Sequence, residues 1–136
     1  MRRPLYLLLA LAQFAIGQAP VKVVRIEPHA HLFCSTATGD PWKTCITITY
    51  QNVSPQVITG IRFEVQFING MKETEPVITV EEFHKVKPGK TTVGWWGDGV
   101  YWNDYGGDKM DATVSVIKVM FADGTFWQVP PKPAAP

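Results

Sequence analysis

The chain has 136 residues, with 13 lysines and arginines, 12 aspartates and glutamates, and a formal net charge of +1. This length fits one domain with a two-layer core and leaves no room for a catalytic domain beside an accessory one. The charges form no basic stripe, so we expect no nucleic-acid partner and no polybasic contact with a membrane.

The first 17 residues have the pattern of a cleaved signal peptide. Arg2 and Arg3 give a positive start, Leu5 to Ile16 form an apolar run, and small residues stand where a signal peptidase cuts. This run, at about 1.5 Å per residue, is too short to cross a hydrocarbon core of about 30 Å, so we expect no permanent membrane span. The chain then divides into a leader (1–17), a domain (18–129) and a disordered, proline-rich tail (130–136). We expect the mature protein to be periplasmic or secreted.

After the leader, short strands alternate with turns, and no segment predicts a helix. In chain order, we expect strands at Val21–Pro28, Cys45–Gln51, Ile61–Ile68, Pro76–Val80, Lys90–Trp96, Ala112–Phe121 and Thr125–Val129. Turns are expected at Asn52–Gln56, Asn69–Gly70, Pro88–Gly89 and Asp123–Gly124, and a loop at Gly97–Gly107. About seven strands without helical connections predict an all-β fold, an antiparallel β-sandwich of immunoglobulin-like or fibronectin-III-like type.

The alternation of residues predicts which side of a strand faces the core. Cys45–Gln51 and Ile61–Ile68 place large apolar side chains on one face and polar ones on the other, as half-buried antiparallel strands require. In Lys90–Trp96 the pattern is less clear. If Trp95 continues an inward face with Val93, then Trp96 points outward.

Cys34 and Cys45 are the only two cysteines of the chain. In an exported protein an even pair favours a disulfide, and the enclosed segment contains the turn residues Gly39, Asp40 and Pro41. We therefore expect a disulfide-closed loop between two strands. A metal or redox pair is the alternative, but the pair lacks a CxxC spacing and a third sulfur.

Four sequence strings resemble a family of small bacterial exported immunoglobulin-like domains that includes the FxLYD type. They are YQNVS, IRFEVQFING, VKPGKTT and VMFADGTFW, and the resemblance spans Ile46 to Trp127. It rests on turns and alternation, not on catalytic residues. The resemblance implies a binding or structural accessory module of the cell envelope.

The chain carries no recognisable catalytic motif. A GxSxG elbow and a GxxxxGK[ST] phosphate loop are both absent from the sequence, and His29, His31 and His84 are the only candidate bases. Glu81 and Glu82 are adjacent, so on a strand they point to opposite faces. We expect a protein that is not an enzyme and that carries no cofactor.

Two motifs offer metal ligands. His29 and His31 lie two residues apart, so an extended backbone projects both rings to one side, where copper or zinc is a suitable ion and His84 or a methionine a candidate third ligand. Exposed polar residues near a chain end are the simpler interpretation. Carboxylates also cluster between residues 98 and 111 and suggest calcium, although their spacing matches no EF-hand loop; they are Asp98, Asp104, Asp108 and Asp111.

The most unusual composition lies between Trp95 and Tyr105, where aromatic residues alternate with acids, amides and glycines. Such a surface can stack on a sugar ring or anchor a protein partner, and the alternative is that these aromatics cap one end of the sandwich. The candidate contact surface comprises Trp96, Tyr101, Trp102, Asn103, Asp104 and Tyr105. We therefore expect an exported, non-enzymatic binding or interaction module with a protein or polysaccharide partner. A carbohydrate-binding module and a copper or zinc site at His29 and His31 are the alternatives.

Overall fold

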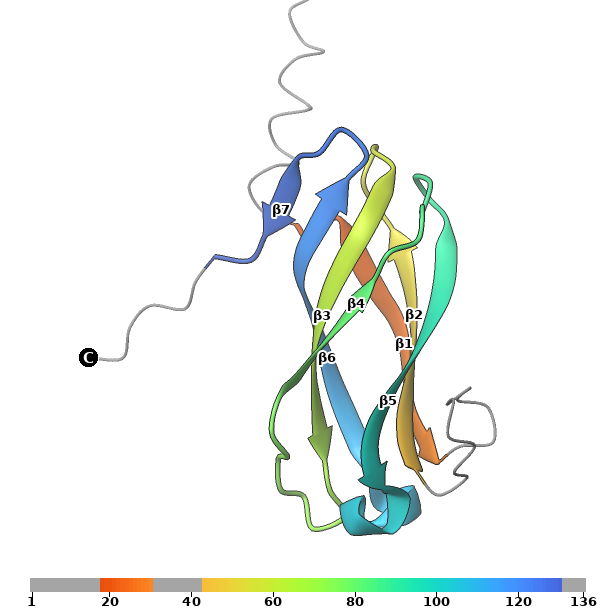
Figure 1. Ribbon diagram of the computed structural model, residues 1–136, viewed down its shortest axis with the longest axis vertical. Coiled ribbons are helices and arrows are strands. Elements are labelled where there is room, and N and C mark those ends of the chain that lie inside the picture. The colour runs from red at the N-terminus through yellow and green to blue at the C-terminus, as the bar shows by residue number, and fades with distance from the viewer. Residues whose placement is uncertain (1–17, 31–42, 131–136) are drawn as a thin grey trace, which may run out of the picture.

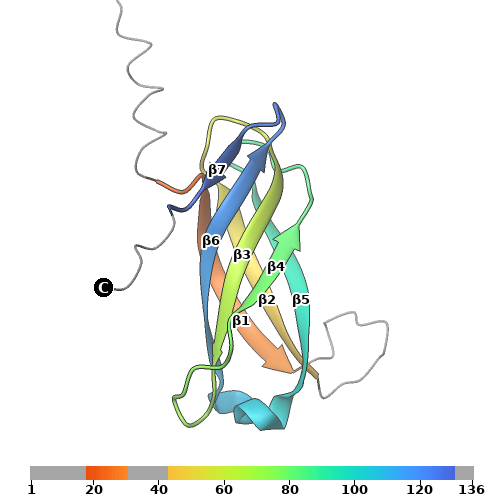
Figure 2. The ribbon, with the colours of Figure 1, turned by 60° about the vertical axis from the view of Figure 1, so that its left-hand side comes forward.

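Seven antiparallel strands form two facing sheets in the computed structural model, which describes residues 18–30 and 43–130 (Figure 1). The strands are β1 (Val21–Ala30), β2 (Lys43–Asn52), β3 (Ile58–Ile68), β4 (Ile78–Glu82), β5 (Thr91–Tyr101), β6 (Asp111–Phe121) and β7 (Phe126–Gln128). One sheet has the order β1-β2-β5 and the other the order β4-β3-β6-β7, as Figure 2 shows from the side of the larger sheet. All strand pairs are antiparallel. The prediction of an all-β sandwich is confirmed at this level.

The alternation in β2 and β3 builds the core between the sheets. Ile46, Ile48 and Tyr50 of β2 are all buried, and the alternate residues of β3 from Ile61 to Phe67 are buried as well. The rings of Tyr50 and Phe63 pack 5.4 Å apart across the sheets. Burial of each such side chain contributes roughly 1.5–3 kcal/mol, so these two strands supply much of the stability. Their predicted faces are confirmed.

β5 is longer than the sequence indicates. The prediction that the strand pattern breaks at Gly97 is wrong, because β5 continues to Tyr101 before two short 3-10 helices, Trp102–Tyr105 and Gly107–Lys109. The reason is pairing with β2, which sets Cys45 opposite Gly97 and Lys43 opposite Tyr101 across an irregular step. Pairing with a neighbouring strand overrides the local glycine signal.

The two faces of β5 are reversed relative to the prediction. Trp95 is 59% exposed, whereas Trp96 packs against the core with its ring 5.7 Å from that of Phe63. Gly94 makes this possible, because a Cβ there would lie 2.2 Å from the indole of Trp96. Because Gly94 has no side chain, the space beside it is filled by the indole of Trp96.

Asn52 ties the turn after β2 to a distant segment. Its side-chain nitrogen donates to the carbonyl oxygens of Gln56 (2.7 Å) and Val86 (2.8 Å), and its Oδ1 accepts from the backbone N–H and the hydroxyl of Ser54. The residue is fully buried. Every polar atom of this side chain therefore has a partner, as burial requires.

Several predictions fall outside the described residues. They are the leader (1–17), His31, Cys34 as the partner expected for Cys45, and most of the proline-rich tail (131–136). Within residues 18–30 and 43–130, no helix has the length and apolar character needed to span a membrane.

Candidate functional site

The six residues predicted to form one contact surface separate into two groups. Trp96, Trp102 and Tyr105 pack against the core, and Tyr105 is only 8% exposed, with its ring 5.4 Å from that of Phe67. The exposed members are Tyr101, Asn103 and Asp104. These positions fit the alternative in which the aromatic residues cap one end of the sandwich.

The outward aromatic residues of β5 are therefore Trp95 and Tyr101. Tyr101 is half exposed, and the Nζ of Lys43 lies 3.9 Å from its ring centroid, a cation–π contact across the β2–β5 pair. Trp95 stands opposite Thr47, which in turn stands opposite Glu27 of β1. Trp96 instead donates its indole N–H to the carbonyl oxygen of Glu81 at 3.1 Å, which links β5 to β4.

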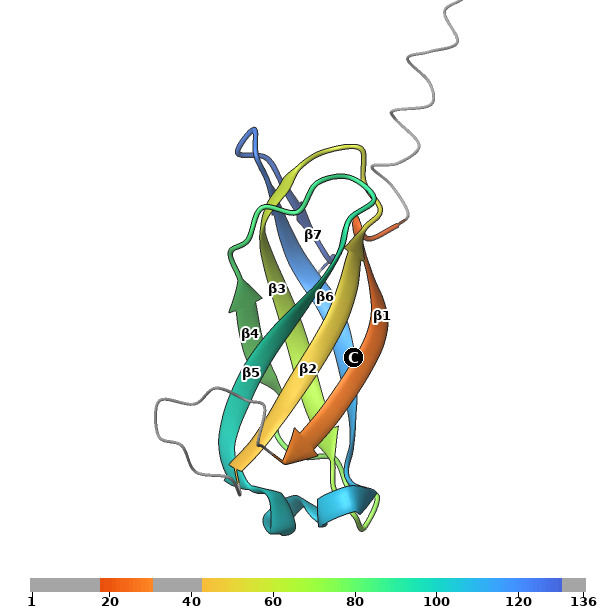
Figure 3. The ribbon, with the colours of Figure 1, turned by 90° about the vertical axis from the view of Figure 1, so that its right-hand side faces the viewer.

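The two described histidines lie far apart. His29, near the end of β1, places its Nε2 2.7 Å from the hydroxyl of Thr47 and its ring 3.8 Å from the sulfur of Cys45. His84 follows β4 and pairs with Glu82, and β1 and β4 end at opposite ends of the sandwich (Figure 3). His84 thus cannot serve as a third ligand beside His29. The described residues contain no cluster of three or more histidine, cysteine, aspartate or glutamate side chains suited to a metal.

The carboxylates suggested for calcium do not converge in the part of the chain that the structure describes. Asp104 and Asp108 are exposed, and Oδ1 of Asp111 accepts the backbone N–H of Ala112 at 2.8 Å. The side chain of Asp98 lies outside what the structure describes. The aspartates here have the ordinary roles of turn and strand-start residues.

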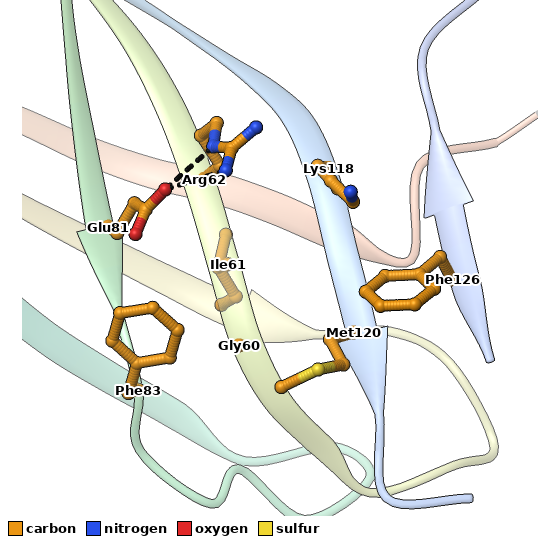
Figure 4. Close-up of a pocket in the computed structure, with 8 residues that line it drawn as sticks. All are labelled: Gly60, Ile61, Arg62, Glu81, Phe83, Lys118, Met120 and Phe126. Atoms are coloured by element: carbon orange, nitrogen blue, oxygen red, sulfur yellow. Dashed lines mark hydrogen bonds and ion pairs between the residues drawn. The ribbon is translucent and has the colours of Figure 1, made fainter. Parts of the chain in front are cut away.

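An apolar groove that the sequence did not predict lies on the outer face of the four-stranded sheet (Figure 4). Phe83, just after β4, and Phe126, on β7, stand on either side and are 69% and 57% exposed. Met120 of β6 lies between them, above Gly60 of β3. A Cβ at Gly60 would lie 3.2 Å from the terminal methyl of Met120, so the glycine gives the groove its depth.

Charged side chains border this groove. Arg62 donates from Nε and Nη2 to the same oxygen of Glu81, at 2.8 and 2.7 Å. Lys118 holds its Nζ 4.5 Å from the centroid of the Phe126 ring. The border therefore combines an ion pair with a cation that lies over an aromatic ring, and the centre of the groove is apolar.

One signal in the sequence could have revealed the groove. Met120 and Phe126 occupy outward positions of β6 and β7, where alternation calls for polar residues, and they stand opposite each other in the register. Two apolar residues paired on a solvent face are an exception to the pattern. Exceptions of this kind often mark interaction surfaces.

A second unusual group lies inside the sandwich. The hydroxyl of Tyr50 is buried and has no hydrogen-bond partner among the described residues, and burial, followed by the nearby charge of Glu82, raises the pKa of Tyr50 well above its usual value. Glu82 points inward from β4 and is 9% exposed, whereas Glu81 points outward to Arg62. The prediction that these two glutamates face opposite ways is confirmed.

Comparison with known proteins identifies a fold but no family. No family model and no curated protein matches the chain. Among solved structures, the chain is similar to a hypothetical protein from Peptoclostridium difficile 630 known from an X-ray structure. The TM-score is 0.57 at 11% identity, over 83% of this chain and 88% of that chain. A likeness at this identity concerns the fold alone.

Proposed function

We propose that the protein is an exported, non-enzymatic binding module that docks a partner protein through the apolar groove. The observation that carries this proposal is the meeting of Phe83, Met120 and Phe126, from three separate parts of the chain, around a depression above Gly60. Export remains a prediction from the sequence of residues 1–17.

The size of the groove favours a protein side chain over a small molecule. Its volume is about 110 Å³, whereas pockets for drug-sized ligands measure about 300–1,000 Å³. A depression of this size accommodates one large apolar side chain of a partner. Of the residue types around the groove, phenylalanine, methionine and arginine are enriched in protein interfaces, whereas the glutamate and the lysine at its border are of depleted types.

We also propose that the sandwich is of the immunoglobulin-like class. In a constant-type immunoglobulin domain the first, second, fifth and fourth strands form one sheet, and the third, sixth and seventh form the other. Here the strand order differs only in the fourth strand, because β4 pairs with β3 instead of with β5. The fibronectin-III-like type shares this sandwich architecture.

Methyl NMR of ¹³C-methionine-labelled protein tests the proposed docking. Titration with the N-acetyl amides of phenylalanine and leucine, as models of a partner side chain, should shift the methyl signal of Met120 in a saturable way. Met71, 80% exposed on the loop before β4, reports non-specific contact, and the buried Met110 reports global change. Phe126→Ala should weaken the binding several-fold, whereas Val77→Ala, an exposed apolar residue near β4, should leave it unchanged.

Two outcomes would overturn the proposal. One is a Met120 signal that shifts no more than that of Met71 at the highest concentration of either amide. The other is saturable binding of an oligosaccharide that Phe126→Ala does not affect and Trp95→Ala abolishes. That second result would assign the protein to carbohydrate-binding modules instead.

A further inference from the structure

The outermost strands of the two sheets differ in how well they are protected against pairing with another chain. β1 contains Pro28, three charged residues and an irregular step after Val23. β4 has five residues, two of them glutamates, and β7 has three residues and is soon followed by Pro130. Short length, charges, prolines and bulges are the means by which edge strands avoid association.

β5 has none of these protections along its first seven residues. It is an outer strand of its sheet, as Figure 3 shows, and Thr91–Gly97 contains no charge and no proline. Its register with β2 is regular over this stretch. Among the described residues, no backbone hydrogen bond or bridge occupies its other edge. Gly94 itself is buried, but Val93 and Trp95 on either side of it are exposed. A long edge of this kind, without charges or prolines, is a template for another strand.

We propose that two copies of this chain associate by antiparallel pairing of their β5 strands about Gly94. The three-stranded sheets then join into one sheet of six strands. This inference does not depend on the proposed docking groove, which lies on the other sheet.

When the two-fold axis passes through Gly94, the residues beside it in one copy are complementary to those in the other copy. Val93 of one copy faces Trp95 of the other, and both side chains are exposed on the outer face of the single chain, at 39% and 59%. Each copy thus covers the apolar residues of its partner, and aromatic–β-branched cross-strand pairs are stabilising.

The absence of charge from the segment also agrees with pairing between identical chains. The segment 91–97 holds no charged residue, so no like charges come opposite each other when it pairs with its own copy. A two-fold axis makes each contact between the copies twice, as closed dimers require.

Analytical ultracentrifugation over a range of concentrations tests the association. The wild-type protein should dimerise reversibly, and Val93→Glu or Trp95→Lys alone should each weaken the dimer by at least about tenfold. An equimolar mixture of these two variants should recover the dimer, because the two substituted positions face each other across the axis. Val24→Glu, at an exposed position on the opposite edge strand of the same sheet, is the matched control and should leave the dimer unchanged.

Thermal unfolding of each variant separates loss of association from loss of folding. Because the substituted side chains are exposed, the Tm of each variant should lie within a few degrees of the Tm of the wild-type protein at a concentration where the wild type is monomeric. A wild-type protein that remains monomeric at millimolar concentration would overturn the proposal. So would a dimer that persists in Val93→Glu, or variants that mixing fails to restore.

Discussion

β3 and β5 have the same length of 11 residues, but only in β3 does the alternation of residues predict which face is buried. In β3 the buried positions Ile61, Phe63 and Val65 are the apolar ones. In β5 the inner positions hold Gly94 and Trp96, and apolar residues also occupy the outer positions. The difference lies in the sizes of the inner side chains: those of β3 are all of medium to large size, whereas β5 carries one large indole, that of Trp96, which needs the gap at Gly94.

This comparison shows where hydrophobic alternation stops being informative. Alternation identifies the inner face when all inner positions bury side chains of similar size. Where a single tryptophan fills the space of two residues, the inner position beside it is a glycine, and a hydrophobicity pattern reads that glycine as polar. For a Gly-x-Trp sequence in a strand, side-chain volume therefore predicts the buried face correctly, and hydrophobicity does not.

Phe63→Ala should have the largest effect, because it removes the central buried side chain that β3 contributes to the core. The ring is fully buried between Tyr50 and Trp96, so we expect a loss of about 3–5 kcal/mol in the free energy of unfolding. Urea denaturation measures this loss. Arg62→Ala, at the preceding residue, whose side chain lies on the outer face, should change stability by no more than about 1 kcal/mol. Equal losses in the two variants would refute the assignment of faces in β3.

Gly94→Ala should have an intermediate effect, because β5 depends on the gap beside Trp96. The added methyl would lie 2.2 Å from the indole and 2.6 Å from a carboxylate oxygen of Glu82, and overpacking of this kind costs about 1–3 kcal/mol. The double variant Gly94→Ala/Trp96→Leu should lose less than the sum of its single variants, because the smaller side chain gives the methyl room. Strict additivity would contradict the steric explanation.

Tyr50→Phe should have the smallest effect at neutral pH. The substitution removes a buried hydroxyl without a partner among the described residues, so stability at pH 7 should stay within about 1 kcal/mol of the wild type. The pKa of Tyr50 is raised in the folded protein, so the folded state holds this proton more tightly than the unfolded state does. The stability that this proton provides is present below about pH 10 and is lost as the pH rises further. Urea titrations from pH 9 to pH 12 should therefore show a shallower loss in Tyr50→Phe, and parallel curves would disprove the coupling.

The positions of the strands and the buried faces of β2 and β3 could be predicted from local pattern, because alternation and turn residues act over a few positions. The continuation of β5 to Tyr101 could not, since it depends on pairing with Lys43, more than fifty positions away in the chain. The composition of the segment after Trp95 suggested a contact surface, but tertiary packing turns Trp102 and Tyr105 inward. The pair of Met120 and Phe126 in the groove has a local signal, but the position of Gly60 and Phe83 beside it depends on tertiary packing that no local pattern predicts.

The buried side chain of Asn52 has a consequence for glycosylation. Asn52-Val53-Ser54 matches the acceptor sequence for N-linked glycans, and export would bring such a chain into contact with the modifying enzymes in hosts that possess them. The amide nitrogen that would receive the sugar instead donates hydrogen bonds to two backbone carbonyls in the interior. A glycan would replace one of the two hydrogens that make these bonds, and the buried nitrogen leaves no room for a sugar, so the native fold conceals this acceptor and only an unfolded chain presents it.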